Sequence, residues 1–176
     1  MHSPIGADLP SFHGFVPDRA RHLFKAGEHD KALLYIKQFV EQGNTYAMLA
    51  MADYEYDQGN KDASLLWVSK VESAADSGDH EACIYLASAY QRGLGAGSHQ
   101  ERQHRSLLML ERAAEQGYVS CAHALMSSYL YGLNGAAVSK ERFAYWAGKA
   151  ASCGSRPAAE ALGKLDDWPN VAPDSE

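Results

Sequence analysis

Ala113-Ala114-Glu115-Gln116-Gly117 is one of four similar segments in this chain of 176 residues. The others are Phe39-Val40-Glu41-Gln42-Gly43, Ala74-Ala75-Asp76-Ser77-Gly78 and Ala150-Ala151-Ser152-Cys153-Gly154. Their closing glycines are 35, 39 and 37 residues apart, a period typical of stacked helical hairpins. Because a single hairpin cannot bury its apolar face, the spacing predicts an all-α solenoid of about four stacked antiparallel helix hairpins.

Small and apolar residues recur at helical spacing within each period. In the 79–117 unit, Ala82, Leu86 and Tyr90 fall on one face of a first helix. A second helix follows, and Gly117 stands where a left-handed cap residue is expected. Each period therefore predicts two helices with a glycine-rich turn between them.

The 44–78 unit departs from this pattern. Glu55 stands where the other units have tyrosine, which leaves a shifted helical register open for this unit. We expect its second helix to bury Leu66 and Trp67 on the same face as Ala74 and Ala75.

The two ends of the chain differ from the repeats. Residues 1–17 contain three prolines and one charge, and they are predicted to form an irregular N-terminal arm. Residues 166–176 carry four acidic and no basic side chains, and we expect them to form a mobile acidic tail. The repeat domain is thus predicted to span residues 18–165.

The composition excludes several classes of protein. A formal net charge of −6 argues against a nucleic-acid binder, and no apolar run is long enough to span a membrane. The start of the chain has neither a basic segment nor the apolar core of a signal peptide. The three cysteines show no C-x-x-C spacing, so the chain is predicted to be cytoplasmic.

Charge is distributed unevenly along the chain. Residues 18–40 carry five basic and three acidic side chains, residues 41–81 two and nine, and residues 82–165 nine and five. We expect the acidic stretch to steer a protein partner that carries a basic patch. The alternative is that this distribution has no function.

No known catalytic motif is found. The sequence lacks nucleophile elbows, phosphate-binding loops and zinc-protease motifs, and its eight histidines supply no convergent ligand set. His123 lies beside predicted core positions, where a hydrogen-bonded histidine is expected. We therefore predict no catalytic residue, no metal site and no cofactor.

The repeat motifs resemble those of the Sel1-like repeat family, α-solenoids related to tetratricopeptide repeats. The residues that carry this likeness are Tyr90 to Gly95, Tyr129 to Gly135, Trp146 to Ala151 and Ala158-x-x-x-Leu162-Gly163. The likeness covers about residues 44–163, and it implies a right-handed solenoid whose first helices line a concave face.

Counted from each closing glycine, positions +3, +7, +10 and +14 of the first helices point away from the predicted core. Tyrosine, acid and arginine at these positions suit a protein interface. The candidate partner-binding residues are Tyr46, Asp53, Asp57, Glu81, Tyr85, Ser88, Arg92, Ser127 and Tyr131.

These features favour a non-catalytic protein-binding module. The resemblance implies roles such as a chaperone-like adaptor or a bacterial immunity protein that holds a cognate toxin inactive. It also leaves two alternatives, a hydrolase of peptidoglycan or β-lactam chemistry and a structural assembly subunit. The sequence does not separate a monomer from a homodimer.

Overall fold

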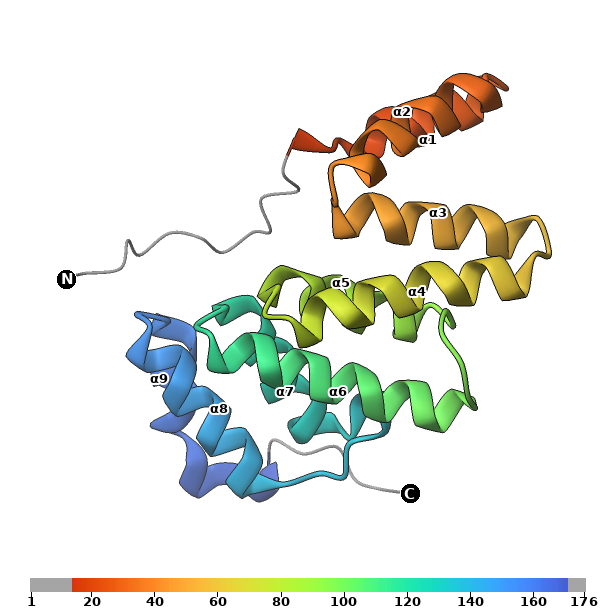
Figure 1. The fold of residues 1–176 in the computed structure, drawn as a ribbon. Coiled ribbons are helices and arrows are strands. Elements are labelled where there is room, and N and C mark those ends of the chain that lie inside the picture. The colour runs from red at the N-terminus through yellow and green to blue at the C-terminus, as the bar shows by residue number, and fades with distance from the viewer. Residues whose placement is uncertain (1–13, 171–176) are drawn as a thin grey trace. The chain divides into compact units, whose positions relative to one another are not determined.

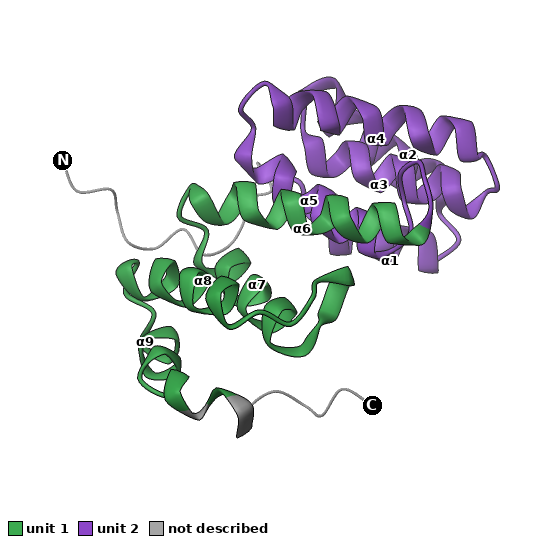
Figure 2. Cartoon of the chain, turned by 90° about the horizontal axis from the view of Figure 1, so that it is seen from below, with its two compact units in different colours: residues 1–9, 99–176 green, residues 10–98 purple. Residues whose placement is uncertain are grey.

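The computed structural model describes residues 14–170, and these residues form helices and connecting turns without a strand (Figure 1). The predicted arm up to residue 13 and the tail from residue 171 lie outside the described residues. The chain divides into two compact units, shown in different colours in Figure 2. We call residues 14–98 the N-terminal unit and residues 99–170 the C-terminal unit, and we describe each separately.

The N-terminal unit contains five helices. Each packs against the next in sequence, and α3 also packs against α5. The helices are α1 (Pro17–Lys25), α2 (His29–Glu41), α3 (Thr45–Asp57), α4 (Lys61–Asp76) and α5 (His80–Gln91).

The C-terminal unit is built in the same way. Its α-helices pack in sequence order, α6 on α7, α7 on α8 and α8 on α9. The elements are α6 (His99–Glu115), α7 (Val119–Tyr131), the 3-10 turn η2 (Leu133–Gly135), α8 (Lys140–Ser152), α9 (Arg156–Leu162) and the 3-10 turn η3 (Leu165–Asn170).

A glycine followed by a capping residue joins one hairpin to the next. Gly43 has a φ of 81°, and the amides of Gly43 and Asn44 donate to the carbonyls of Val40 and Phe39, which closes α2. The Asn44 side chain then accepts from the amide of Ala47 at 2.8 Å and begins α3. The Gly43-Asn44 dipeptide therefore ends α2 and begins α3.

The same device recurs at two of the three later repeat boundaries, because Tyr118 after Gly117 does not cap α7 through its side chain. Gly78 and Gly154 have positive φ angles, and Asp79 and Ser155 cap the following helices through their side chains. Gly117 has a φ of 94°, which confirms the left-handed cap predicted there. Asp79, which lies in the acidic 41–81 stretch, is therefore a helix cap.

The core largely follows the predicted faces. Leu86, Tyr90, Leu125 and Trp146 are all buried, as expected from their helical spacing. Leu66 was expected in the core but is 58% exposed.

The second helix of the 44–78 unit buries a different face. Val68, Val71 and Ala75 are buried on α4, at a spacing of three and four residues. The side chain of Lys70 covers the half-buried Trp67 ring, with Nζ 4.0 Å from the ring centre. The core face of α4 is thus rotated from the one predicted around Leu66.

Candidate partner-binding groove

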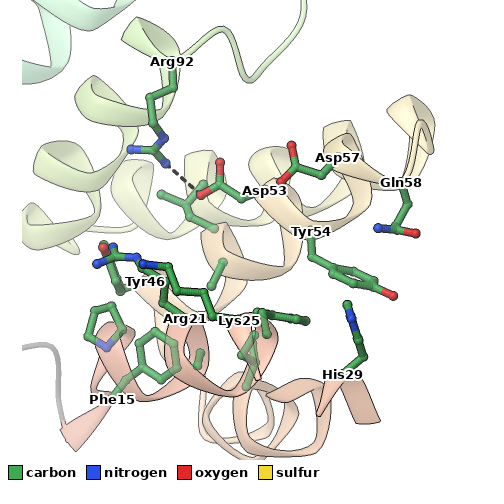
Figure 3. Close-up of a pocket in the computed structure, with 16 residues that line it drawn as sticks. Phe15, Arg21, Lys25, His29, Tyr46, Asp53, Tyr54, Asp57, Gln58 and Arg92 are labelled. Atoms are coloured by element: carbon green, nitrogen blue, oxygen red, sulfur yellow. Dashed lines mark hydrogen bonds and ion pairs between the residues drawn. The ribbon is translucent and has the colours of Figure 1, made fainter. Parts of the chain in front are cut away.

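The N-terminal unit has a pocket of about 420 Å³ between α1 and α3 (Figure 3). We call it the α1–α3 groove. Its apolar lining combines aromatic and aliphatic residues, and charged side chains also line it. The apolar residues include Phe15, Phe24, Ile36, Tyr46, Leu49 and Tyr54, and the charged residues are Arg21, Lys25, Asp53, Asp57 and Arg92.

Aromatic contacts hold the two sides of the groove together. Phe24 of α1 stacks on Tyr54 of α3, with ring centres 5.5 Å apart and planes 16° from parallel. Phe15, just before α1, is buried, and its ring centre lies 5.8 Å from that of Tyr46 on α3. Because aromatic pairs in such geometries are mutually stabilising, these contacts stabilise the walls of the groove.

An ion pair closes one end of the groove. Arg92, the residue after α5, donates to Asp53 Oδ2 at 3.0 Å (Figure 3). It also donates to Ser88 Oγ at 2.7 Å. Burial raises the pKa of Asp53 above its usual value, although the guanidinium of Arg92 acts in the opposite direction. Burial thus disfavours the ionised form of the Asp53 carboxylate, and Arg92 compensates only part of this effect.

The structure brings some of the predicted residues together in this groove. Tyr46, Asp53, Asp57 and Arg92 line it, although Arg92 is distant from the others in sequence. These four residues come from two first-helix segments of the predicted repeat pattern.

Three other predicted residues do not line the groove. Tyr85 is 5% exposed, so it belongs to the core and not to the open face. Its ring centre lies 4.8 Å from that of Tyr46. Its hydroxyl donates to Glu81 Oε2 at 3.2 Å, and Ser88 holds Arg92. The packing of α3 against α5 explains why the outward position of Tyr85 is covered.

The last two predicted residues lie in the C-terminal unit. Ser127 and Tyr131 of α7 line a second pocket of about 400 Å³, between α7, α9 and η3. Trp168 of η3 also lines this pocket, and its ring centre lies 5.1 Å from that of Phe143 on α8. Six of the nine predicted residues therefore line two pockets, one in each unit, and the other three line neither pocket.

Sequence reasoning missed the contribution of α1. Ala20, Arg21, Phe24 and Lys25 all line the groove, at the spacing of a single helix face. The outward positions predicted above begin after Gly43 and so do not include this helix. The same positions counted from Gly14 include Arg21 and Phe24, but not Ala20 or Lys25.

Polar contacts elsewhere serve the fold. The half-buried His123 has Nε2 2.7 Å from Ser155 Oγ, which confirms the expected hydrogen-bonded histidine. Ser155 also accepts from the amide of Ala158, as the cap of α9. Within residues 14–170, no three histidine, cysteine or acidic side chains are grouped to hold a metal ion.

Two of the three cysteines are buried. Cys83 and Cys121 are buried thiols, and Cys153 is an exposed thiol. Among the described helices, none combines the length and apolar character that crossing a membrane requires.

Comparison with known proteins identifies the fold. No protein-family model and no curated protein matches the chain significantly. A Sel1 repeat protein from Oxalobacter formigenes matches 91% of this chain at a TM-score of 0.51 and 21% identity. A second structure, c5321, a protective antigen of uropathogenic Escherichia coli strains with an SLR fold, matches 82% of the chain at a TM-score of 0.32 and 21% identity.

The chain is shorter than either of these proteins. It spans 65% of the Oxalobacter chain and 41% of the c5321 chain. The likeness to the Oxalobacter protein agrees with the glycine period, the paired helices and the absence of strands within residues 14–170. The chain therefore has the all-α solenoid fold of Sel1 repeat proteins.

Proposed function

We propose that this protein is a non-catalytic protein-binding module, and that the α1–α3 groove receives a segment of its partner. One observation carries the proposal. One groove with aromatic residues in its walls brings together four residues that were predicted to lie on the outward face of the first helices. They are Tyr46, Asp53, Asp57 and Arg92.

The chemistry of the groove suits a protein segment. Tyrosine and arginine are enriched among the residues that dominate binding energy, and an apolar centre within a polar rim is typical of protein interfaces. A volume of about 420 Å³ lies in the range of ligand pockets and is enough for a few large side chains. The groove would thus anchor an apolar part of the partner while the rim selects its charges.

Site-specific photocrosslinking tests the proposal. Gln58 lines the groove, whereas Gln38 is exposed on α2 and lies outside it. A photoreactive phenylalanine replaces each glutamine in turn, in the native cell. We expect a discrete crosslinked partner from position 58 and none from position 38.

Two results would contradict the groove as the binding site. One is a crosslinked partner from position 38 alone, and the other is no crosslink from position 58. A crosslink between two copies of this chain would instead indicate the assembly subunit that the sequence left open.

The roles of immunity protein and chaperone-like adaptor both require a complex with one cognate protein. Co-expression with the partner crosslinked at position 58 separates them. An immunity protein restores the growth of cells that the partner alone inhibits. An adaptor forms the same complex, but its partner does not inhibit growth when it is produced alone.

A further inference from the structure

The α1–α3 groove has opposite charges on its two walls. Arg21 and Lys25 come from α1, whereas Asp53 and Asp57 come from α3 (Figure 3). The aromatic lining, with Phe24 stacked on Tyr54, lies between these two helices. A segment that lies in the groove therefore meets basic side chains along one edge and acidic side chains along the other.

The two walls do not neutralise each other. Arg21 pairs with Asp18 on its own helix, and both side chains are more than 60% exposed, so this bond is weak. Among residues 14–170, no ion pair joins α1 to α3. Lys25 and Asp57 have no ion pair within the same described part of the chain, so both remain available to a partner.

The pair between Asp53 and Arg92 adds to this arrangement. Burial disfavours the ionised form of Asp53, so its carboxylate gains from a further cation nearby. Arg92 occupies Oδ2 of this carboxylate. A basic side chain of a partner would therefore add an interaction that the free protein lacks.

We infer that the partner segment carries an apolar anchor between two edges of opposite charge, with acidic side chains facing Arg21 and Lys25 and basic side chains facing Asp53 and Asp57. This inference rests on the proposed function and specifies the chemistry of the partner. It replaces the uniformly basic patch expected from the sequence, because such a patch would place like charges against the α1 wall. Like charges brought together reduce affinity and so exclude wrong partners.

Three fluorescein-labelled peptides of equal length test the inference. All are designed as amphipathic helices with the same tryptophan and leucine stripe. The first has lysine along one edge of the stripe and glutamate along the other, the second has lysine on both edges, and the third has glutamate on both. Fluorescence anisotropy at low salt measures binding to the full chain.

We expect the mixed-charge peptide to bind about tenfold more tightly than either single-sign peptide, because two favourable pairs replace two repulsive ones. This preference should shrink at high salt because Arg21, Lys25 and Asp57 are exposed, and salt screens exposed charges. The wild-type chain overturns the inference if it binds the three peptides equally, prefers a single-sign peptide or binds none.

Charge reversal on each wall makes the test specific. The variant R21E/K25E should prefer the all-lysine peptide, and D53K/D57K should prefer the all-glutamate peptide. Reversing all four charges should restore the preference for the mixed peptide, which can enter in the opposite direction. The matched control K37E/E41K changes exposed charges on α2 outside the groove and should bind like the wild type.

One outcome separates this inference from the proposed function. Thermal melting by circular dichroism first establishes that each variant is folded. A crosslinked partner at position 58 without the charge preference overturns the inference and leaves the proposed function standing. Loss of that crosslink contradicts both.

Discussion

The hydroxyl of Tyr129 on α7 donates a hydrogen bond to Glu111 Oε1 on α6 at 2.8 Å. Tyr90 on α5 makes the equivalent bond to Glu72 on α4, again to a residue 18 positions earlier. Each unit thus joins the second helix of one hairpin to the first helix of the next through a tyrosine whose ring is buried. The bond supplies the polar partner that a buried phenol requires.

Replacing Tyr129 by phenylalanine removes this bond and keeps the ring. We expect the free energy of unfolding to fall by about 1 kcal/mol, the typical contribution of one such hydrogen bond. Urea denaturation of Tyr129→Phe against the wild type measures the change. An unchanged midpoint would show that the bond does not contribute to stability.

The same bond predicts a pH dependence. Burial, together with the neighbouring Glu111, raises the pKa of Tyr129 to about 12. The folded state therefore holds the proton of the Tyr129 hydroxyl more tightly than the unfolded state. The contribution of this hydroxyl to the free energy of unfolding is complete below pH 10 and is lost as the pH rises through 12. The stability difference between wild type and Tyr129→Phe should therefore narrow from pH 9 to pH 12, and a constant difference would contradict this.

Asp79 is expected to act on stability. Its carboxylate accepts from the amide of Ala82 at 3.0 Å and from the hydroxyl of Thr45 at 3.1 Å. Replacing this cap by alanine should cost about 1 kcal/mol, whereas asparagine should retain most of the stability because it caps equally well. Thermal melting compares both with Asp57→Ala, an exposed residue that caps no helix and should change stability by less than about 0.5 kcal/mol.

Three glycines are expected to respond differently to alanine. Gly148 lies within α8 and has open space around it, so Gly148→Ala should stabilise the protein by about 0.5–1 kcal/mol. Gly78→Ala should destabilise it by about 1–2 kcal/mol because its φ is 105°. Gly95→Ala should cost the most, since its Cβ would lie 2.8 Å from the Tyr90 ring.

Chemical denaturation of the three glycine variants gives their order of stability. A destabilised Gly148→Ala would contradict its position inside a regular helix. A neutral Gly95→Ala would show that the ring of Tyr90 can move away.

The core of the C-terminal unit depends on Trp146, which is 2% exposed. Trp146→Ala should cost about 3–5 kcal/mol and Leu125→Ala about 2–5 kcal/mol, through lost packing and the cavity left behind. Leu66→Ala is the control, because this exposed leucine should change stability by less than about 0.5 kcal/mol. Calorimetry that finds all three variants equally stable would remove Trp146 and Leu125 from the core.

Several features were predictable because they depend on neighbours in sequence. Gly117 adopts the left-handed conformation expected of it, and Leu86, Leu125 and Trp146 lie on the buried faces that their spacing indicated. The capping role of Asp79 could also have been read from its place after Gly78.

Other features required the packing of helices. Leu66 and Tyr85 both had plausible helical positions, yet the neighbouring helices leave Leu66 exposed and cover Tyr85. Periodicity alone places a residue on a face of its own helix. It does not show how wide a stripe the next helix covers.

The repeated helix pairs follow from the local sequence, because glycines and capping residues act over a few bonds. Which polar side chains share a groove depends instead on tertiary packing. Asp53 and Arg92 are 39 residues apart and meet because α3 packs against α5, while Lys25 reaches the same groove from α1. Such meetings depend on how the helices pack, and many sequences with the same period can pack in different ways.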